Sequence, residues 1–384
     1  MIERGKLFFI FKVFLIVLII SFILGCKKEK VDVIIDLSRA VQSLDIQKSY
    51  IFESGKDGFQ YAYGTVNVLN ENEVYITAVR YPKILSDFKE KAEIISTLSK
   101  DNGFNWGDTK IVQTNIGLKN TSNPSVIKIS NDQLFMNFSA VNSTSNIDLY
   151  YKQSIDNGET WSTPIGINES GQGYHVAVND RLVFNNRRLF LPAAYVDGDI
   201  FEKYEDQEVI MFVSDNYGKS WKKNSILKSN HSLMEPNLVF INSEEAIINM
   251  RTKLGYVYFG RSTDGGGNWF LQKSNIESPA SPQKIVKIPG KDILVMIWNN
   301  NRENFRSSFN NRSPLSIAIS KDKGYNWTYL GDIEDSKEFD YAYPSISFSK
   351  EEMFVLYYER EKITNNKSSL KLARLPLKSL LNTK

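Results

Sequence analysis

Several charged and aromatic residues of this chain have the chemistry to bind an anionic ligand. Glu235 and Arg251 stand at the two ends of one predicted strand pair, while Arg312 and Tyr341 stand just before later strands. A concave cluster of arginines with a carboxylate and a phenol binds anions and shifts the pKa values of its members. These four residues predict a site only if the fold brings them together.

A five-fold repeat indicates which fold positions them. In each copy, Ser is followed by an acidic or amide residue two positions on, Gly four on and Trp seven on. The copies are Ser99-Asp101-Gly103-Trp106, Ser154-Asp156-Gly158-Trp161, Ser214-Asn216-Gly218-Trp221, Ser262-Asp264-Gly266-Trp269 and Ser320-Asp322-Gly324-Trp327. This pattern resembles the Asp box, a hairpin turn in which the Asp caps backbone N–H groups, Gly takes a conformation that other residues avoid, and Trp packs below. We expect these turns to be structural and not catalytic.

Six strand pairs with alternating apolar residues lie between these turns. They are Tyr61 to Tyr81, Ser122 to Asn142, Gly173 to Val196, Met234 to Thr252, Pro279 to Asn299 and Tyr341 to Arg360. With the strands that enter and leave each turn, they predict an all-β, six-bladed β-propeller over residues 49–384. Ser369 to Leu375 and Ser49 to Glu53 would complete the last blade and close the ring, which removes an open sheet edge.

Propeller topology also predicts which residues share a face. The start of the first strand of a blade, the end of the second and the loop after it meet on one rim, and the repeated turns occupy the other. The residues gathered on the first rim are Tyr61, Arg80, His175, Tyr195, Asp197, Glu235, Arg251, Arg312, Tyr341 and Arg360. Several arginines with a Glu and a Tyr on one rim predict a site for an anionic ligand.

Four stretches carry a resemblance to a known family. They are Glu235-Pro236-Asn237-Leu238 leading to Asn249-Met250-Arg251, then Arg312 to Ala318, Tyr341-Ala342-Tyr343-Pro344, and Leu372-Ala373-Arg374-Leu375. Together with the repeats, they resemble the bacterial sialidase superfamily with BNR (Asp-box) repeats. The resemblance implies an exo-acting glycoside hydrolase that removes a terminal acidic sugar from glycans, with a glycan as its anionic partner.

The resemblance also implies roles for individual residues. In sialidases an arginine triad holds the substrate carboxylate, and a Tyr paired with a Glu is the nucleophile, which spares an anionic sugar the approach of a second anion. Carried over by position, the roles are Glu235 as base, Tyr341 as nucleophile, Asp87 as acid, Arg251 and Arg312 as carboxylate ligands, Arg360 or Arg80 as a third, and His175 as a further ligand contact.

The sequence departs from the sialidase pattern at the start of the first blade. That pattern has an Arg there, whereas this chain reads Tyr61-Ala62-Tyr63-Gly64-Thr65. Two alternatives therefore stay open: a propeller glycosidase that acts on another glycan, and a non-catalytic surface lipoprotein that binds glycan or protein. No zinc-type Cys/His cluster, phosphate-binding loop or Ser-His-Asp order occurs, so no metal or cofactor is expected.

The N-terminus reads as a lipoprotein signal. Arg4 and Lys6 precede the apolar run Leu7 to Leu24, and Ile23-Leu24-Gly25-Cys26 resembles a bacterial lipobox. We expect residues 1–25 to be a signal peptide, Cys26 to carry the lipid, and residues 26–48 to form the anchor and tether of an exported monomer at the bacterial cell membrane or outer membrane. Because Cys26 is the only cysteine, we expect no disulfide within the body. The net charge of +3 is too small to indicate a nucleic-acid-binding protein.

Overall fold

The structure is a computed structural model that describes residues 32–38, 44–86, 88–301, 311–363 and 367–381. The expected signal peptide, Cys26 and Asp87 lie outside these residues. The regular secondary structure of the described part is almost entirely β-strand, with one 3-10 turn at Tyr204–Asp206 and the short helix α2 at Leu377–Leu381. No helix within it is long and apolar enough to cross a membrane. The prediction of an all-β fold is confirmed.

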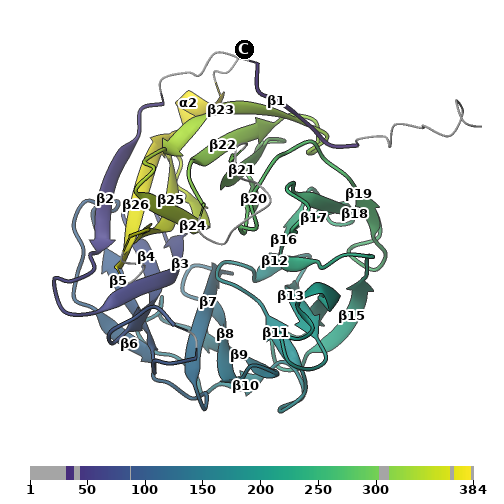
Figure 1. The fold of residues 1–384 in the computed structure, drawn as a ribbon. Helices are drawn as coiled ribbons and strands as arrows, with labels where there is room; N and C mark the ends of the chain where they lie inside the picture. The colour runs from purple at the N-terminus through teal and green to yellow at the C-terminus, as the bar shows by residue number, and fades with distance from the viewer. Residues whose placement is uncertain (1–31, 39–43, 87, 302–310, 364–366, 382–384) are drawn as a thin grey trace, which may run out of the picture.

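The sheets stand around a central axis in a propeller-like ring (Figure 1). One four-stranded sheet contains β3 (Gln60–Val68), β4 (Val74–Tyr81), β5 (Glu93–Ser99) and β6 (Lys110–Gln113). A second contains β16 (Met234–Phe240), β17 (Ala246–Arg251), β18 (Tyr258–Ser262) and β19 (Phe270–Gln272). A third contains β24 (Phe339–Phe348), β25 (Glu352–Glu361), β26 (Ser368–Pro376) and β2 (Gln47–Phe52). The innermost strands β3, β16 and β24 face the axis.

Two larger sheets complete the ring. A five-stranded sheet contains β20 (Lys284–Lys287), β21 (Leu294–Asn299), β22 (Leu315–Ser320), β23 (Asn326–Glu334) and β1 (Ile34–Asp36). A nine-stranded sheet contains β7 (Asn120–Lys128), β8 (Leu134–Ser143), β9 (Asn146–Ser154), β10 (Ile165–Gly166), β11 (Tyr174–Val176), β12 (Val183–Asn185), β13 (Arg188–Val196), β14 (Glu208–Ser214) and β15 (Lys222–Leu227).

The described strands thus form five sheets where the sequence predicted six separate ones. The difference arises at β11, which pairs with β13 in antiparallel fashion and also with β9 in parallel, through Tyr174 and Ile147. The predicted strand pair Gly173 to Val196 is also interrupted. Two short strands, β11 and β12, pair with opposite ends of β13, and the chain leaves the sheet between them.

The ends of the chain join the ring in two places. β2 pairs with β26, so an N-terminal strand completes the last sheet, as the sequence predicted. β1, which falls inside the expected tether of residues 26–48, pairs in parallel with β23. Val33 and Ile35 are buried there against Trp298 and Trp327. Part of the expected tether therefore belongs to the folded body.

The five repeated turns have the predicted Asp-box geometry. In the first, the Ser99 hydroxyl donates to Asp101 at 2.8 Å, and the backbone N–H of Asn105 donates to the same carboxylate at 2.8 Å. Hydrogen bonds from the backbone and side chain of Asn105, with that from Ser99, lower the pKa of Asp101 to about 2. Gly103 has a φ of +84°, which explains the glycine. The turns are built as structural devices.

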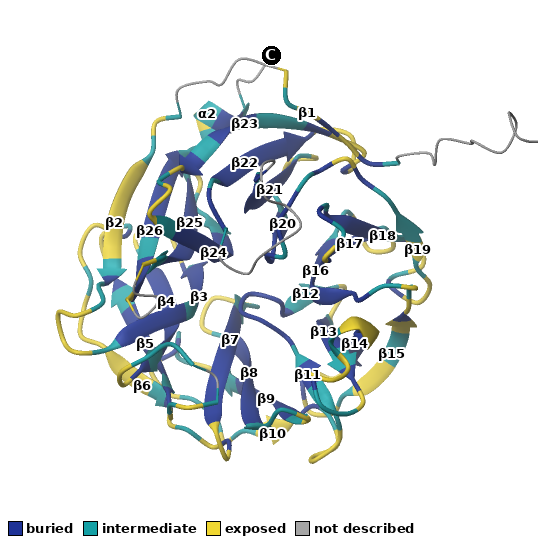
Figure 2. Ribbon diagram, viewed as in Figure 1, coloured by how far each residue is buried: buried dark blue, intermediate teal, exposed yellow. Residues whose placement is uncertain are grey.

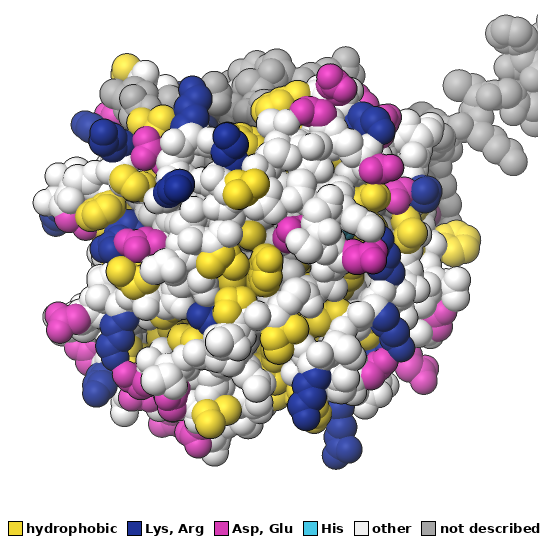
Figure 3. Space-filling view, turned by 90° about the horizontal axis from the view of Figure 1, so that it is seen from below, with side chains coloured by type: hydrophobic (Ala, Val, Ile, Leu, Met, Phe, Trp, Pro, Cys, Tyr) yellow, Lys and Arg dark blue, Asp and Glu magenta, His cyan; other side chains and the backbone are white. Residues whose placement is uncertain are grey.

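Burial follows the distance from the axis (Figure 2). Every residue of β17 is buried, whereas four of the six residues of β2 and three of the six residues of β15, on the outer edge, are exposed. Inner strands pack between neighbouring sheets on both faces, so even polar side chains such as Thr65 in β3, Ser125 in β7 and Asn237 in β16 are buried. Figure 3 shows one side of the molecule, where charges of both signs are interspersed and no patch of one sign dominates.

Candidate functional site

A repeated bulge in the innermost strands builds the candidate site. Tyr63, Asn123, Glu235 and Tyr343 each have a positive φ, between +40° and +57°. At each, the inner strand has one residue more than the neighbouring strand, so the register shifts by one residue. The residue that follows is Gly64, Pro124, Pro236 or Pro344, and proline inside a strand is confined to edges and bulges. The four side chains line one central cavity.

Glu235 joins two of the site's other residues. Its Oε2 accepts from Arg251 Nη1 at 2.7 Å, and its Oε1 accepts from the Tyr343 hydroxyl at 3.0 Å. All three side chains are almost completely buried. A carboxylate with one cation and one phenol partner can take the proton of that phenol.

Arg312 supplies the second cation. Its guanidinium lies 5.3 Å from the centre of the Tyr343 ring, and its Nη1 donates to the Tyr358 hydroxyl at 2.7 Å. Arg312 Nε is buried and has no hydrogen-bond partner among the described residues. Tyr63 packs edge-on against Tyr343 with ring centres 4.7 Å apart. Tyr343 is therefore held between two tyrosines, a guanidinium and a carboxylate.

Electrostatics keep Glu235 ionised and Tyr343 neutral. Burial alone would raise the pKa of Glu235, but Arg251 and Arg312 outweigh it and lower that pKa. Burial and the Glu235 carboxylate raise the pKa of Tyr343. The hydrogen bond consequently runs from a protonated phenol to an ionised carboxylate, which is the arrangement that a proton transfer from Tyr343 to Glu235 requires.

The central cavity has a volume of about 270 Å³ and is lined by two kinds of side chain. Glu235, Arg251, Arg312 and Tyr343 supply charged and polar groups. Most of the other lining residues are apolar or aromatic, namely Phe88, Val141, Ile147, Tyr174, Val176, Val178, Ile200, Phe201, Tyr204 and Met234. Phe201 is 71% exposed and packs on Phe88 with ring centres 6.1 Å apart. The cavity suits a ligand with one anionic end and an apolar portion.

A buried polar segment, Asn179-Asp180-Arg181, supports this cavity. Asn179 Nδ2 donates to the backbone oxygens of Gly64 at 2.7 Å and Tyr343 at 3.0 Å. The fully buried Arg181 donates to the backbone oxygens of Asn179, Asp180 and Gln283. The segment therefore ties the strands that carry Tyr63 and Tyr343 to one another.

The structure does not bring Tyr341 to Glu235. Tyr341 packs in the apolar core beside Tyr357, with ring centres 6.1 Å apart, and only 1% of it is exposed. The bulge adds one residue to β24, so Tyr343 lines the central cavity while Tyr341 lies on the other side of the strand. Tyr343 therefore occupies the position beside Glu235 that the sequence analysis gave to Tyr341. The proline after Tyr343, which matches the proline after Glu235, could have indicated this from the sequence.

Three other predicted residues lie outside the lining of the central cavity. Arg80 is paired with Glu93 and covers Phe59. Arg360 is paired with Asp340 at 3.2 Å. His175 faces a different cavity, because it points to the opposite side of β11 from Tyr174 and Val176. Asp87 precedes the cavity residue Phe88 in sequence but lies outside the described residues. Glu235, Arg251 and Arg312 are brought together as predicted.

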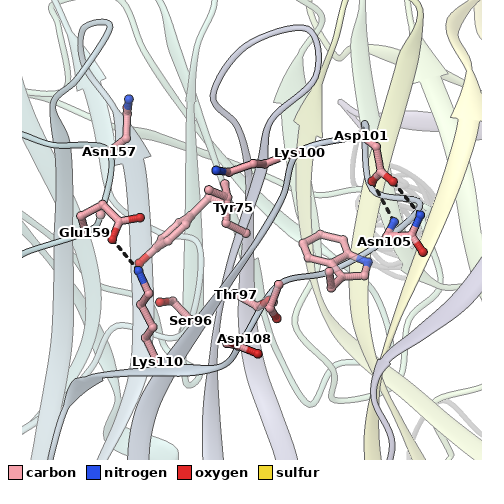
Figure 4. Close-up of a pocket in the computed structure, with 14 residues that line it drawn as sticks. Tyr75, Ser96, Thr97, Lys100, Asp101, Asn105, Asp108, Lys110, Asn157 and Glu159 are labelled. Atoms are coloured by element: carbon pink, nitrogen blue, oxygen red, sulfur yellow. Dashed lines mark hydrogen bonds and ion pairs between the residues drawn. The ribbon is translucent and has the colours of Figure 1, made fainter.

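A larger cavity, of about 460 Å³, lies on the Asp-box side between the first two repeated turns (Figure 4). Four of its lining residues already have partners, because Lys110 pairs with Glu159 and Asp101 accepts from Asn105. We therefore assign these four residues to the packing of the turns and their neighbouring strands. Within the described part of the chain, no group of three or more His, Cys, Asp or Glu residues could hold a metal ion.

Comparison with known proteins identifies the family. The model of the BNR repeat-like domain matches residues 79–355. No curated protein matches the chain. Among solved structures, the Hadza microbial sialidase Hz136 is 17% identical with a TM-score of 0.71, over 87% of this chain and 69% of that one. The Trypanosoma rangeli sialidase is 16% identical with a TM-score of 0.71, over 88% of this chain and 61% of that one.

A third similar structure has no function in its description. It is a protein of unknown function from Dyadobacter fermentans, 15% identical with a TM-score of 0.68, over 86% of this chain and 99% of that one. This chain spans about three fifths of the Trypanosoma sialidase. The protein has the fold of the sialidase superfamily. It belongs to the BNR repeat-like family.

Proposed function

We propose that this protein is an exo-acting glycoside hydrolase of sialidase type that removes a terminal acidic sugar from glycans. The observation that carries the proposal is the hydrogen bond from the Tyr343 hydroxyl to Glu235, with Arg251 and Arg312 beside it. A Trypanosoma rangeli sialidase of the same fold binds sialic acid, which supports an acidic sugar as the ligand.

The two arginines would hold the carboxylate of the sugar. Arg312 Nε is a buried donor without a described partner, so it is available to a ligand. Asn123 Oδ1 is likewise buried without a described partner, lines the central cavity, and would accept from a sugar hydroxyl. The apolar lining residues would cover an apolar substituent of the sugar or the leaving group.

Tyr343 would be the nucleophile and Glu235 its base. The Tyr343 oxygen bonds to the anomeric carbon while the bond to the leaving-group oxygen breaks, and the phenol proton passes to Glu235. A substrate carboxylate that draws Arg251 and Arg312 to itself weakens their hold on Glu235 and raises its basicity. Water then attacks the anomeric carbon, the bond to the Tyr343 oxygen breaks, and Glu235 returns its proton to that oxygen. The proton of the water passes to the group that protonated the leaving group in the first step, and the two displacements give retention.

Asp87 is our candidate for the acid that protonates the leaving group. Glu235 is the only carboxylate among the described residues that line the central cavity. A second carboxylate must therefore come from elsewhere, and Asp87 directly precedes the cavity residue Phe88. The same scarcity of carboxylates favours the second candidate, a propeller that binds an acidic glycan without cleaving it.

Two structural proposals accompany this function. We propose that the ring corresponds to six blades, and the two Asp boxes and two sets of strands joined at β11 in the nine-stranded sheet support this proposal. We also propose that Cys26 anchors the exported protein to a bacterial membrane by a lipid, on the strength of the lipobox pattern.

A panel of fluorogenic glycosides tests the function. It should contain a sialoside, a uronoside and neutral glycosides, and turnover should be measured for wild-type protein and for Glu235→Gln. Release of an acidic sugar that Glu235→Gln abolishes supports the proposal. Arg312-dependent binding of an acidic sugar without any turnover would establish the binding protein, and hydrolysis of neutral glycosides alone would establish a glycosidase of another specificity.

A further inference from the structure

A second cavity lies behind β11, on the opposite side of that strand from the central cavity. We call it the side cavity, and it has a volume of about 230 Å³. Its lining residues are Ile167, Asn168, Glu169, Gln172, His175, Tyr195, Phe212, Trp221, Lys222 and Lys223. None of these residues lines the central cavity, so the proposed function does not account for them.

His175 brings an unmet hydrogen-bond acceptor to the side cavity. The residue is 1% exposed, and its Nδ1 donates to the backbone oxygen of Ile147 at 3.2 Å. Since Nδ1 carries the proton, Nε2 is an acceptor, and it has no partner among the described residues. Burial lowers the pKa of His175 to about 4, so the ring is neutral at pH 7.

Trp221 brings an unmet donor to the same cavity. Two other Asp boxes satisfy the corresponding indole N–H, because Trp269 donates to Gly266 at 3.1 Å and Trp327 donates to Gly324 at 3.2 Å, whereas Trp161 Nε1 is buried without a described partner but does not line this cavity. Trp221 Nε1 is buried without a described partner. Buried polar groups are nearly always paired, so an orphan acceptor and an orphan donor in one cavity indicate a ligand with hydroxyl groups.

The wall beside them is held rigid by Asp148. This buried carboxylate accepts from the Ser170 hydroxyl at 3.0 Å, from the backbone N–H of Gly171 at 3.0 Å and from Asn168 Nδ2 at 3.4 Å. Asn168 in turn accepts from the backbone N–H of Leu149 at 2.6 Å. The segment from Asn168 to Gly171 is therefore fixed in place before any ligand arrives, which lowers the entropic cost of binding.

Charge and ring surface narrow the class of ligand. Lys223 lies 5.5 Å from the centre of the Tyr195 ring, Lys222 is already paired with Asp215, and Glu169 adds a negative charge. The balanced charge disfavours a strongly ionic ligand. Tyr195 and Trp221 offer aromatic surface for an apolar ring face, with polar groups at its edge.

We propose that the side cavity is a second binding site, for one neutral sugar residue of a glycan. A sugar hydroxyl donates to His175 Nε2, another oxygen accepts from Trp221 Nε1, and the ring lies against the aromatic residues. The proposal does not depend on catalysis in the central cavity.

Saturation-transfer NMR on the full-length protein tests this proposal, with galactose, glucose and N-acetylglucosamine each offered alone. At least one should bind saturably. His175→Leu should weaken that binding about tenfold, the effect of one lost buried hydrogen bond. Trp221→Phe keeps an aromatic ring but removes the N–H, and should weaken binding similarly. His231→Leu, at the other histidine, should bind as wild type.

Two results would overturn the proposal. One is that none of the three sugars binds wild-type protein, which would mean that the cavity holds only water. The other is that a sugar binds His175→Leu as tightly as wild type, which would place it elsewhere. If His175→Leu fails to fold, Trp221→Phe decides the question by the same criteria.

Discussion

The Tyr343 hydroxyl donates a hydrogen bond of 3.0 Å to Glu235 Oε1, and the two residues stand at equivalent bulges of β24 and β16. Each precedes a proline and has a positive φ. The propeller thus presents a phenol and a carboxylate from two separate sheets at the same depth of one cavity. The pairing depends on the bulges and not on any contact between sequence neighbours.

Tyr343→Phe should lower turnover by about 10²-fold or more, since a group that takes part in proton transfer contributes about 10²–10⁴-fold. The ring remains packed between Tyr63 and Tyr358, so the melting temperature should change little. Tyr341→Phe is the matched control, because Tyr341 lies in the apolar core and should retain turnover. Steady-state kinetics of both variants would show which tyrosine is the nucleophile. Loss of turnover in Tyr341→Phe with normal turnover in Tyr343→Phe would assign that role to Tyr341.

Arg312→Met should chiefly weaken binding of a carboxylated substrate. Hydrogen bonds to charged groups contribute about 1.5–3 kcal/mol, so KM should rise about 10–150-fold. Tyr358→Phe removes the hydroxyl that Arg312 contacts at 2.7 Å but keeps the cation, so its KM should rise far less. Equal effects of the two variants would show that Arg312 orders the protein and does not bind the carboxylate.

Trp327→Ala should destabilise the fold without altering the chemistry. Trp327 is 1% exposed at an Asp box, and truncation of a buried aromatic costs about 3–5 kcal/mol. Trp106→Ala, at a box whose Trp is only partly buried, should cost less. Denaturant unfolding measures both, and the remaining folded Trp327→Ala protein should keep its KM. If Trp327→Ala were as stable as wild type but inactive, the Asp boxes would have to lie close to the active site, which would contradict this account.

His175 should make stability fall on the acid side of neutrality. Its folded pKa of about 4 lies below the unfolded value of about 6.5, so the unfolded chain binds the proton first. The stability that the neutral ring contributes is complete above about pH 6.5 and is lost as the pH falls towards 4. In His175→Leu the free energy of unfolding should depend much less on pH between about 6.5 and 4, whereas His231→Leu should retain most of that dependence. Identical curves for wild type and His175→Leu would refute this assignment.

Much of the fold could be predicted because its signals are local. The Ser, Asp, Gly and Trp of an Asp box contact one another within eight residues, so their spacing alone defines the turn. The pairing of β2 with β26 followed from the need to cover an edge strand. The parallel contact of β11 with β9 could not be foreseen, because it rests on one residue pair, Tyr174 and Ile147.

The site could be predicted in part for the same reason. Glu235, Arg251 and Arg312 were found because strand ends determine which rim they share. Tyr341 was chosen because it starts the predicted strand pair, whereas the bulge at Tyr343 and Pro344 adds one residue to β24 and so reverses which side chains face the cavity. Asn179 supports the site through hydrogen bonds to Gly64 and Tyr343, which are far from it in sequence, so no local pattern could predict this contact.

The most direct test of the central claim is to trap the proposed covalent intermediate on Tyr343. The 2,3-difluoro derivative of whichever acidic sugar the glycoside panel selects should be incubated with the protein, and the labelled peptide identified by mass spectrometry. A Trypanosoma rangeli sialidase of the same fold has been captured as such an intermediate. We predict one adduct, on Tyr343, which Tyr343→Phe abolishes and Tyr341→Phe retains. An adduct on Tyr341 or Glu235, or no adduct on a protein that hydrolyses the sugar, would contradict the account.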